Sequence, residues 1–317
     1  MPPAITTTDL TKQYKGVRAL DGLSLEIPQG SIYGFLGANG AGKTTTLKIL
    51  AGLTKPTSGK ATIAGVPLEA GESYKRAIGY LGQDPRFYGW MTARQTLRYV
   101  AGFYPWVQDP IDRRIDEALA LTGITDAADR PTRTYSGGMR QRLGIAQALI
   151  GRPQVLLLDE PASALDPIGR RDVLDLMEGL RGQATIFYST HILDDVQRVS
   201  DHVAILDRGA LVRAAPTQEL LSTFDHDRVR VVVRGVSDST AGGLAALPGV
   251  VSVQLDARDA DTATFLVQAR AGATDAVQAA VTRYAVESDL VLVSNAPEKA
   301  DLEEVFLRLI DSKERAA

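Results

Sequence analysis

The chain has 317 residues, a formal net charge of −3 and no cysteine. This length allows two domains with sizeable cores, and the slightly acidic balance argues against nucleic acid as the main partner. Without cysteine there can be no disulfides, thiol catalysis or cysteine metal sites. The three histidines (His191, His202 and His226) are too scattered to predict a histidine-rich metal site.

The N-terminus, MPPAITTTDL, lacks the basic start and the apolar run of a signal peptide. No window approaches the run of about 18 apolar residues that a membrane-spanning helix needs. We therefore expect a cytoplasmic protein that reaches any membrane through a partner.

Strand-like and helical patterns alternate over the first two thirds of the chain. The apolar run Val155–Leu158 is continuous, as is typical of a strand buried on both faces of a parallel sheet. Between Thr92 and Gly151 the pattern is almost entirely helical, which predicts a helical subdomain inserted into an α/β core. Strands are expected at residues 23–27, 32–36, 78–81, 155–159, 184–189 and 202–206, and a helix at 43–53.

The pattern changes at about Phe224, so we expect a first domain at residues 1–223 and a second at 224–317. In the second, strands and helices follow in the order βαββαβ, which is typical of a ferredoxin-like α+β unit. A last helix carries one apolar face. That face consists of Leu302, Val305, Phe306, Leu309 and Ile310.

The stretch GANGAGKT, Gly37–Thr44, has the spacing G-x-x-x-x-G-K-T directly after an expected strand and at the start of a helix. Glycines let successive N–H groups converge on phosphate oxygens, and the helix N-terminus adds partial positive charge. Lys43 is placed to reach the β- and γ-phosphates, and the Thr44 hydroxyl to face Mg²⁺. The pattern predicts an ATP site built by Gly37, Asn39, Gly40, Ala41, Gly42, Lys43, Thr44 and Thr45.

A pair of acids ends the buried strand VLLLDE. Asp159 is placed to hold Mg²⁺ through water, and Glu160 to accept a proton from an attacking water. Alone, such a pair would be read as solvated carboxylates at a strand end, but beside a phosphate loop the catalytic interpretation is favoured. Three weaker candidates are Gln83 for Mg²⁺ and water, His191 for the γ-phosphate, and Tyr14 for the adenine ring. Each also has an ordinary alternative, as surface, structural or packing residue.

The stretch TYSGGMRQRLGIAQALIG predicts a helix that begins after Ser136, a good N-cap residue. Its first turn contains Gly137 and Gly138, each of which costs a helix about 1 kcal/mol relative to alanine. A flexible capped start would be the ordinary explanation for so bare a helix N-terminus.

In this order the motifs resemble the ATP-binding subunits of ABC transporters over about residues 4–223. Members of that family pack head to tail as dimers, so the resemblance implies that Ser136, Gly137 and Gly138 bind the γ-phosphate held by a second copy. Both halves of the site look complete, which fits a homodimer. The resemblance identifies Tyr14 as the adenine-stacking aromatic, Gly37–Thr44 as Walker A, Gln83 as the Q-loop glutamine, Ser136–Met139 as the signature, Asp159 and Glu160 as the end of Walker B, Ser163–Asp166 as the D-loop and His191 as the switch histidine.

The sequence departs from the family pattern at Tyr135 and Met139, where many members have Leu and Gln. The backbone amides and Ser136 remain, but a glutamine contact is lost. The C-terminal unit, which ends in DLEEVFLRL, resembles that of the ATPases of exporters whose membrane subunits are encoded separately. These include the daunorubicin-type drug-resistance ATPases. We expect it to stabilise a dimer or to regulate, without chemistry of its own.

The working hypothesis is an exporter ATPase subunit that uses ATP and Mg²⁺ and joins a separate permease at the inner face of the membrane. The segment Gln83–Met91 is the expected permease surface, although Phe87, Tyr88 and Trp90 would alternatively pack the helical subdomain. One rival is a soluble ABC ATPase acting on nucleic acid or the ribosome, which usually has two cassettes or basic patches. Another is a P-loop kinase, which leaves the signature and D-loop motifs unexplained. The cargo is not predicted.

Overall fold

The computed structural model describes residues 2–104, 108–223, 227–259, 261–298 and 302–316. The chain divides into two compact units: Met1–Thr217 with Phe306–Ala317, and Gln218–Val305. The domain boundary expected near Phe224 and the residue His226 lie outside the described residues.

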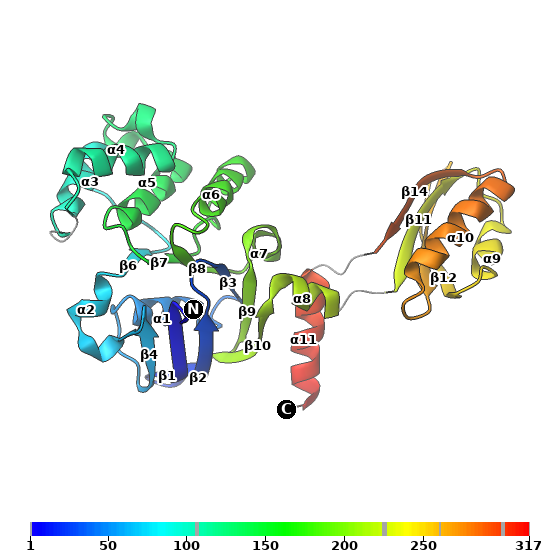
Figure 1. Ribbon diagram of the computed structural model, residues 1–317, viewed down its shortest axis with the longest axis horizontal. Coiled ribbons are helices and arrows are strands. Elements are labelled where there is room, and N and C mark those ends of the chain that lie inside the picture. Colours follow the sequence, from blue (N-terminus) through cyan, green and yellow to red (C-terminus); the bar gives the residue numbers. More distant parts are fainter. Residues whose placement is uncertain (1, 105–107, 224–226, 260, 299–301, 317) are drawn as a thin grey trace. The chain divides into compact units, whose positions relative to one another are not determined.

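The first unit is built around a mostly parallel sheet (Figure 1). Its strand order is β10-β9-β3-β8-β7-β6, in which β10 is an antiparallel edge strand. Every residue of β3, β7 and β8 is buried, which confirms the prediction from the continuous apolar run in VLLLD. The strands are β3 (Ile32–Leu36), β6 (Ile78–Leu81), β7 (Val155–Asp159), β8 (Thr185–Thr190), β9 (His202–Asp207) and β10 (Ala210–Pro216).

A second, antiparallel sheet in this unit has the order β2-β1-β4-β5. Helix α1 (Lys43–Leu50) starts at the phosphate loop and buries Leu47, Ile49 and Leu50 in the core shared with these strands. Most of this sheet was not predicted, because its strands are half exposed and polar. They are β1 (Ile5–Tyr14), β2 (Val17–Ile27), β4 (Ser58–Ile63) and β5 (Val66–Pro67), and the short helix α2 (Glu72–Lys75) follows.

The expected helical subdomain is present as a group of three helices with a core of its own (Figure 1). Its first helix begins with a capping box in which Thr92 and Gln95 satisfy each other's backbone amides. The three helices are α3 (Ala93–Ala101), α4 (Ile111–Leu121) and α5 (Gly137–Leu149); the chain then returns to β7, and α6 (Pro167–Gly179), α7 (Leu193–Val199) and α8 (Thr217–Thr223) follow later.

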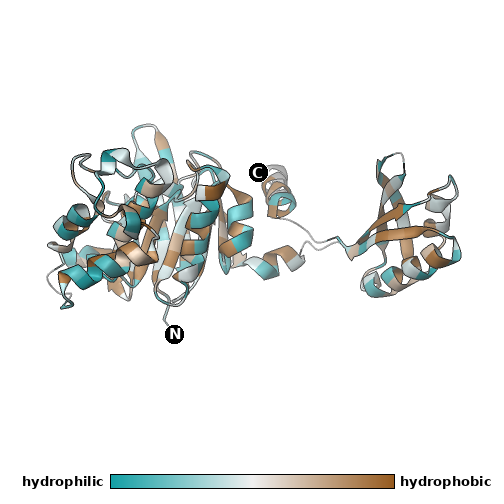
Figure 2. Cartoon of the chain, turned by 90° about the horizontal axis from the view of Figure 1, so that it is seen from above, coloured by the Kyte–Doolittle hydropathy of each residue, from teal (hydrophilic) through white to brown (hydrophobic). Residues whose placement is uncertain are grey.

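The second unit has an antiparallel sheet in the order β12-β13-β11-β14. Alternate residues of β11 and β13 are buried against the helices, and strands of this sheet are coloured as hydrophobic in Figure 2. The element order and strand order are those of a ferredoxin-like unit, as predicted. The elements are β11 (Arg228–Arg234), α9 (Thr240–Ala245), β12 (Val250–Arg258), β13 (Thr262–Ala269), α10 (Thr274–Glu287) and β14 (Val291–Pro297). The last helix of the chain, α11 (Leu302–Ala316), belongs to the first unit from Phe306 onward.

Candidate functional site

The loop between β3 and α1 is in close backbone contact at its first and last glycines, which leaves no room for a side chain at either position. A Cβ atom added at Gly37 would lie 2.4 Å from the carbonyl oxygen of Leu206, and one added at Gly42 would lie 2.5 Å from that of Ala19. Gly42 also has a φ of 108°, a conformation that favours glycine. The loop can therefore take this shape only if both positions are bare.

Lys43 begins α1, and its ammonium group lies inside this loop. Nζ donates to the carbonyl oxygens of Gly37 at 2.6 Å and Ala38 at 3.1 Å, and it lies 3.8 Å from Glu160 Oε1. Burial lowers the pKa of Lys43, although the charges of Glu160 and Asp159 act in the opposite direction. A buried cation that relies on carbonyl oxygens is well suited to an incoming phosphate.

Asp159 ends β7 with a carboxylate that is held by two hydroxyl groups. Ser189 on β8 donates to Oδ1 at 2.6 Å, and Thr44 on α1 donates to the same oxygen at 3.0 Å. No cluster of three or more His, Cys, Asp or Glu side chains that could hold a metal occurs within the described ranges. Thr44 and Asp159 nevertheless bring two hard oxygen ligands together. This donor set fits Mg²⁺, which takes few protein carboxylates and completes its shell with water and phosphate oxygens.

Glu160 follows at once, where the chain turns out of the strand. Its φ is 47°, which is uncommon for a residue other than glycine, and its amide donates to Ser189 Oγ at 3.0 Å. Gln83 Nε2 donates to Glu160 Oε2 at 3.3 Å, and His191 Nδ1 lies 3.3 Å from the same oxygen. The structure thus brings the three predicted catalytic residues, Glu160, Gln83 and His191, into direct contact.

These groups open onto a cleft of about 590 Å³. Asn39 and Gly40 of the phosphate loop and Thr45 of α1 also line it, whereas Ala41 is buried and does not. Gly37 does not line the cleft; it lies against the backbone of Leu206. The remaining lining residues are Ser163 and Ala164 of the D-loop, together with Val17 and Ala19, which the sequence did not indicate.

Tyr14 is not among the residues that line this cleft. Its side chain lies at the end of β1, 45% exposed, with Lys12 Nζ 4.9 Å from the ring centroid. Val17, near the start of β2, lines the cleft and is largely exposed. Contact between Tyr14 and an adenine ring therefore stays a prediction.

The helix N-terminus at Ser136 has the predicted form. Helix α5 begins at Gly137, and the Ser136 hydroxyl caps it by accepting the Met139 amide at 3.2 Å. The cap lies in a second hollow of about 440 Å³, which is also lined by Asp166 of the D-loop. Ala164 lines both this hollow and the cleft above.

Packing within the described chain does not explain the two glycines that begin α5. A Cβ atom at Gly137 would meet Leu165 Cδ2 at 3.8 Å, and one at Gly138 would come no nearer than 4.0 Å to Gly169 Cα. Both are ordinary contact distances, unlike the clashes at Gly37 and Gly42. Space is open in front of this helix N-terminus.

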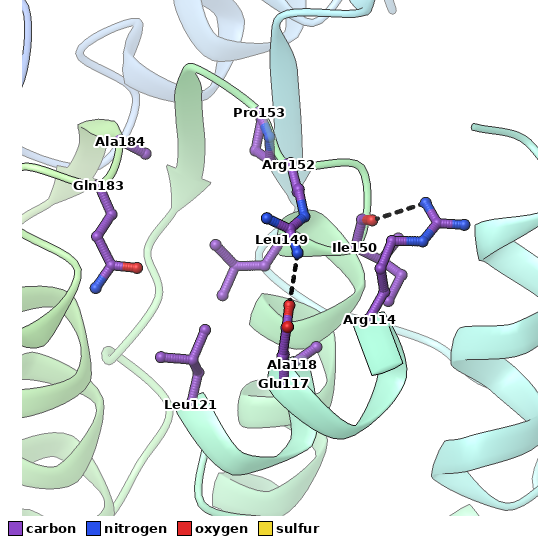
Figure 3. Close-up of a pocket in the computed structure, with 10 residues that line it drawn as sticks. All are labelled: Arg114, Glu117, Ala118, Leu121, Leu149, Ile150, Arg152, Pro153, Gln183 and Ala184. Carbon is purple, nitrogen blue, oxygen red and sulfur yellow. Dashed lines mark hydrogen bonds and ion pairs between the residues drawn. The ribbon is translucent and has the colours of Figure 1, made fainter. Parts of the chain in front are cut away.

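A smaller hollow of about 240 Å³ lies where the helical subdomain joins the sheet (Figure 3). Arg152 reaches across it to Glu117 at 2.7 Å, while the Arg114 guanidinium turns away and donates to the Ile150 carbonyl oxygen at 3.4 Å. Ile150 is the C-cap residue of α5, so Arg114 places a positive charge where the helix dipole is negative. The Arg114 bond therefore links α4 to the end of α5 within the helical subdomain, and the Arg152–Glu117 pair links α4 to the segment that returns to β7.

Ser189 is the functional residue that the sequence analysis missed. It is fully buried and bonds to both Asp159 and Glu160, so it fixes the two acids relative to each other. The available signal was its place at the end of a buried strand, two residues before His191.

Comparison with known proteins identifies the family of the chain. Residues 20–163 match the ABC transporter family. The chain is 34% identical over 317 residues to the daunorubicin resistance ATP-binding protein DrrA3 of Streptomyces coeruleorubidus, covering 98% of this chain and 97% of that protein. It is 40% identical over 236 residues to the bacitracin transport ATP-binding protein BcrA of Bacillus licheniformis, covering 73% of each chain.

Among solved structures, the chain is similar to the dimeric ATP-binding cassette MJ0796 in a post-hydrolysis state bound to ADP and Pi. The TM-score is 0.61 at 25% identity, over 67% of this chain and 98% of that one. The first unit is therefore an ABC-type P-loop core.

The chain belongs to the ABC transporter family, as an ATP-binding subunit and ATPase. Subunits of this class work with membrane permeases. Within the described ranges, no helix has the length and apolar character needed to cross a bilayer.

Proposed function

We propose that this subunit works as a homodimer in which each copy completes the nucleotide site of the other. The observation that carries the proposal is the bare, open N-terminus of α5. Gly137 and Gly138 cost helix stability, yet a side chain at either position would meet nothing closer than 3.8 Å within the described chain. A phosphate held by a second copy explains both the glycines and the free N–H groups.

Within one copy, the proposed phosphate ligands are the loop amides and Lys43. The loop residues are Gly37, Asn39, Gly40, Ala41, Gly42, Thr44 and Thr45, and Tyr14 is the proposed adenine contact. Thr44, Asp159 and Gln83 are the proposed Mg²⁺ ligands, and the ion would neutralise charge on the phosphates.

The proposed chemistry rests on Glu160. Its Oε2 is the group that takes a proton from the attacking water, and Gln83 and His191 hold that oxygen at 3.3 Å each. The Lys43 ammonium group lies 3.8 Å from the other oxygen, Glu160 Oε1, in the same buried site. His191, which lies 3.3 Å from Glu160 Oε2, is the proposed contact to the γ-phosphate.

We further propose that the subunit drives export through a separate permease and so lies at the inner face of the membrane. Support comes from the relatives named for daunorubicin resistance and bacitracin transport. The proposed permease contact is the segment Gln83–Met91. In it Phe87 packs on the helical-subdomain core, whereas Tyr88 and Trp90 are exposed, with ring centroids 6.0 Å apart. Residues 224–317 are the proposed accessory domain.

The test is the mass of purified Glu160→Gln protein in solution, with and without ATP and Mg²⁺. This substitution removes the proton acceptor but leaves the nucleotide ligands, so ATP should convert monomers into dimers that do not turn over. Ser136→Arg in the same background is the control, because a large side chain at the cap would block the partner's phosphate. It should bind ATP and stay monomeric.

Two results would contradict the proposal. If the Glu160→Gln protein binds ATP with no change in mass, then ATP does not dimerise the subunit through this surface. If the Ser136→Arg variant still dimerises, the contact lies elsewhere. For the wild-type protein, the product of turnover separates the two activities. An ATPase releases free phosphate, whereas a P-loop kinase would yield a phosphorylated acceptor.

A further inference from the structure

A partly buried ion pair joins two helices that flank the proposed catalytic groups. Arg170, in the first turn of α6, donates from Nε to Asp195 Oδ1 of α7 at 2.6 Å. The Asp195 side chain is 3% exposed and that of Arg170 is 29% exposed. Neither residue lines the nucleotide cleft. The pair therefore needs an explanation other than contact with nucleotide.

Helix α7 carries His191 at its entrance. The helix begins at Leu193 and is seven residues long, so a shift of its first turn would move His191 with it. On the sheet side it is in tight contact with β3: a Cβ atom at Gly34 would lie 3.0 Å from Val196 Cγ1. On the side of α6, Asp195 is held by Arg170. These two contacts fix the first turns of α7.

Helix α6 begins at the hollow that contains Ser136. Its N-cap is Asp166, whose Oδ1 accepts the Gly169 amide at 2.7 Å, and the Arg170 amide donates to the Asp166 carbonyl oxygen at 2.8 Å. Gly169 and Asp166 both line the hollow. Arg170 is therefore attached to the segment that would face a second subunit.

Helix packing alone does not account for the pair. A second ion pair, Arg198–Asp175, joins the same two helices, and its side chains are 40% and 53% exposed. Burying a charged pair has a desolvation cost that its attraction barely offsets, so an apolar contact would hold the helices equally well. A directed bond from one guanidinium to one carboxylate fixes relative position, which apolar packing does less strictly.

We propose that Arg170 is a positioning residue for His191. Through Asp195 it holds the start of α7 so that His191 Nδ1 stays beside Glu160 Oε2. It also ties that position to the first turn of α6, which follows the D-loop. The inference rests on the proposed roles of Glu160 and His191. The Arg170–Asp195 bond would thus couple His191 of one subunit to the surface that contacts the second subunit.

The test is a double-mutant cycle on the full-length protein, with Arg170→Gln, His191→Ala and both together. Steady-state ATP hydrolysis gives kcat and KM for each variant. Arg170→Gln should lower kcat by about tenfold or more while KM for ATP changes less than about twofold, because the phosphate loop is intact. In the His191→Ala background the same change should alter the residual kcat by less than about twofold.

Two matched controls make the same Arg→Gln substitution at other positions on α6 and α7. Arg171→Gln removes the neighbouring arginine of α6, which is exposed. Arg198→Gln breaks the exposed ion pair between the same two helices. Both should keep kcat within about twofold of the wild type, as expected of surface changes.

Three outcomes would overturn the inference or its basis. An equal loss of kcat in both backgrounds would show that Arg170 does not act through His191. If His191→Ala leaves kcat unchanged, the proposed role of His191 fails instead, whatever Arg170 does. The double variant Arg170→Met/Asp195→Leu leaves no unpaired buried charge and so should fold. Wild-type kcat in that variant would show that the pair serves only to pack the two helices. A low kcat at a normal melting temperature would support its role in positioning His191.

Discussion

The hydroxyl of Ser189 donates to Asp159 Oδ1 at 2.6 Å and accepts the amide of Glu160 at 3.0 Å. One small side chain on β8 thus fixes the end of β7, where the proposed Mg²⁺ ligand Asp159 is followed by the proposed proton acceptor Glu160. His191 is only two residues further along the chain. The acids and the histidine are therefore positioned by the same strand end.

Replacing this hydroxyl should destabilise the protein. Ser189→Ala leaves the buried Glu160 amide without its acceptor and Asp159 without one of its two hydroxyl donors. An unsatisfied buried polar group of this kind costs about 1–3 kcal/mol, so we expect a loss of that size in the free energy of unfolding by urea.

Ser24 provides a control for this change. Its hydroxyl accepts the Asp9 amide at 2.9 Å and donates to Asp9 Oδ1 at 3.3 Å, the same arrangement in an exposed position. Because water can replace the lost bonds there, Ser24→Ala should change stability by less than about 0.5 kcal/mol. Equal effects of the two substitutions would contradict the argument from burial.

The glycines of the phosphate loop should differ in their tolerance of a methyl group. Gly42→Ala combines a φ of 108° with a contact of 2.5 Å to the Ala19 carbonyl oxygen, and that backbone atom cannot move away cheaply. Gly40 has a φ of 84°, but a Cβ atom there would meet nothing within 4 Å. We expect losses of about 3–5 kcal/mol and about 1–2 kcal/mol respectively, from strain with and without overpacking.

Thermal unfolding without nucleotide would measure this difference. The comparison isolates the closure of the loop from its contacts with phosphate, because no ligand is present. Equal melting temperatures for the two variants would show that the backbone around Gly42 yields more easily than the contact to Ala19 implies.

Much of the first unit could be predicted because buried parallel strands have a strong signal. Val155–Leu158 is apolar throughout, and the strand predicted from it, residues 155–159, has the same bounds as β7 in the structure. The Walker A spacing likewise places glycine at positions 37 and 42, where a Cβ atom would clash with backbone carbonyl oxygens. The half-exposed strands β1 and β4 were missed, since threonine- and lysine-rich segments have no clear apolar period.

Contacts between distant segments could not be read from the sequence. Ser189 and Arg170 are ordinary residue types, and their roles depend on which strand or helix lies beside them. The prediction for Phe87, Tyr88 and Trp90 illustrates the same limit, because adjacent aromatics in one loop divide between core and surface.

That division of the aromatics has a measurable consequence. Phe87→Ala removes packing from the core of the helical subdomain and should lower stability by about 1–3 kcal/mol, less than for a fully buried phenylalanine. Trp90, which is 67% exposed, should tolerate alanine within about 0.5 kcal/mol. Chemical denaturation of the two variants tests this directly. A large loss for Trp90→Ala would place its ring in the core and remove it from the proposed permease surface.

Lys43 should give the stability of the nucleotide-free protein a dependence on alkaline pH. Burial lowers the pKa of Lys43 below its ordinary value of 10.5, so between the lowered and the ordinary pKa the unfolded chain binds a proton that the folded chain does not. The free energy of unfolding that this group contributes must therefore rise with pH across that window. Urea titrations at about pH 7 and about pH 9.5 should show the wild type gaining stability relative to Lys43→Met, a comparison in which other titrating groups cancel. A difference that stays constant with pH would mean that Glu160 and Asp159 fully offset the cost of burying the ammonium group.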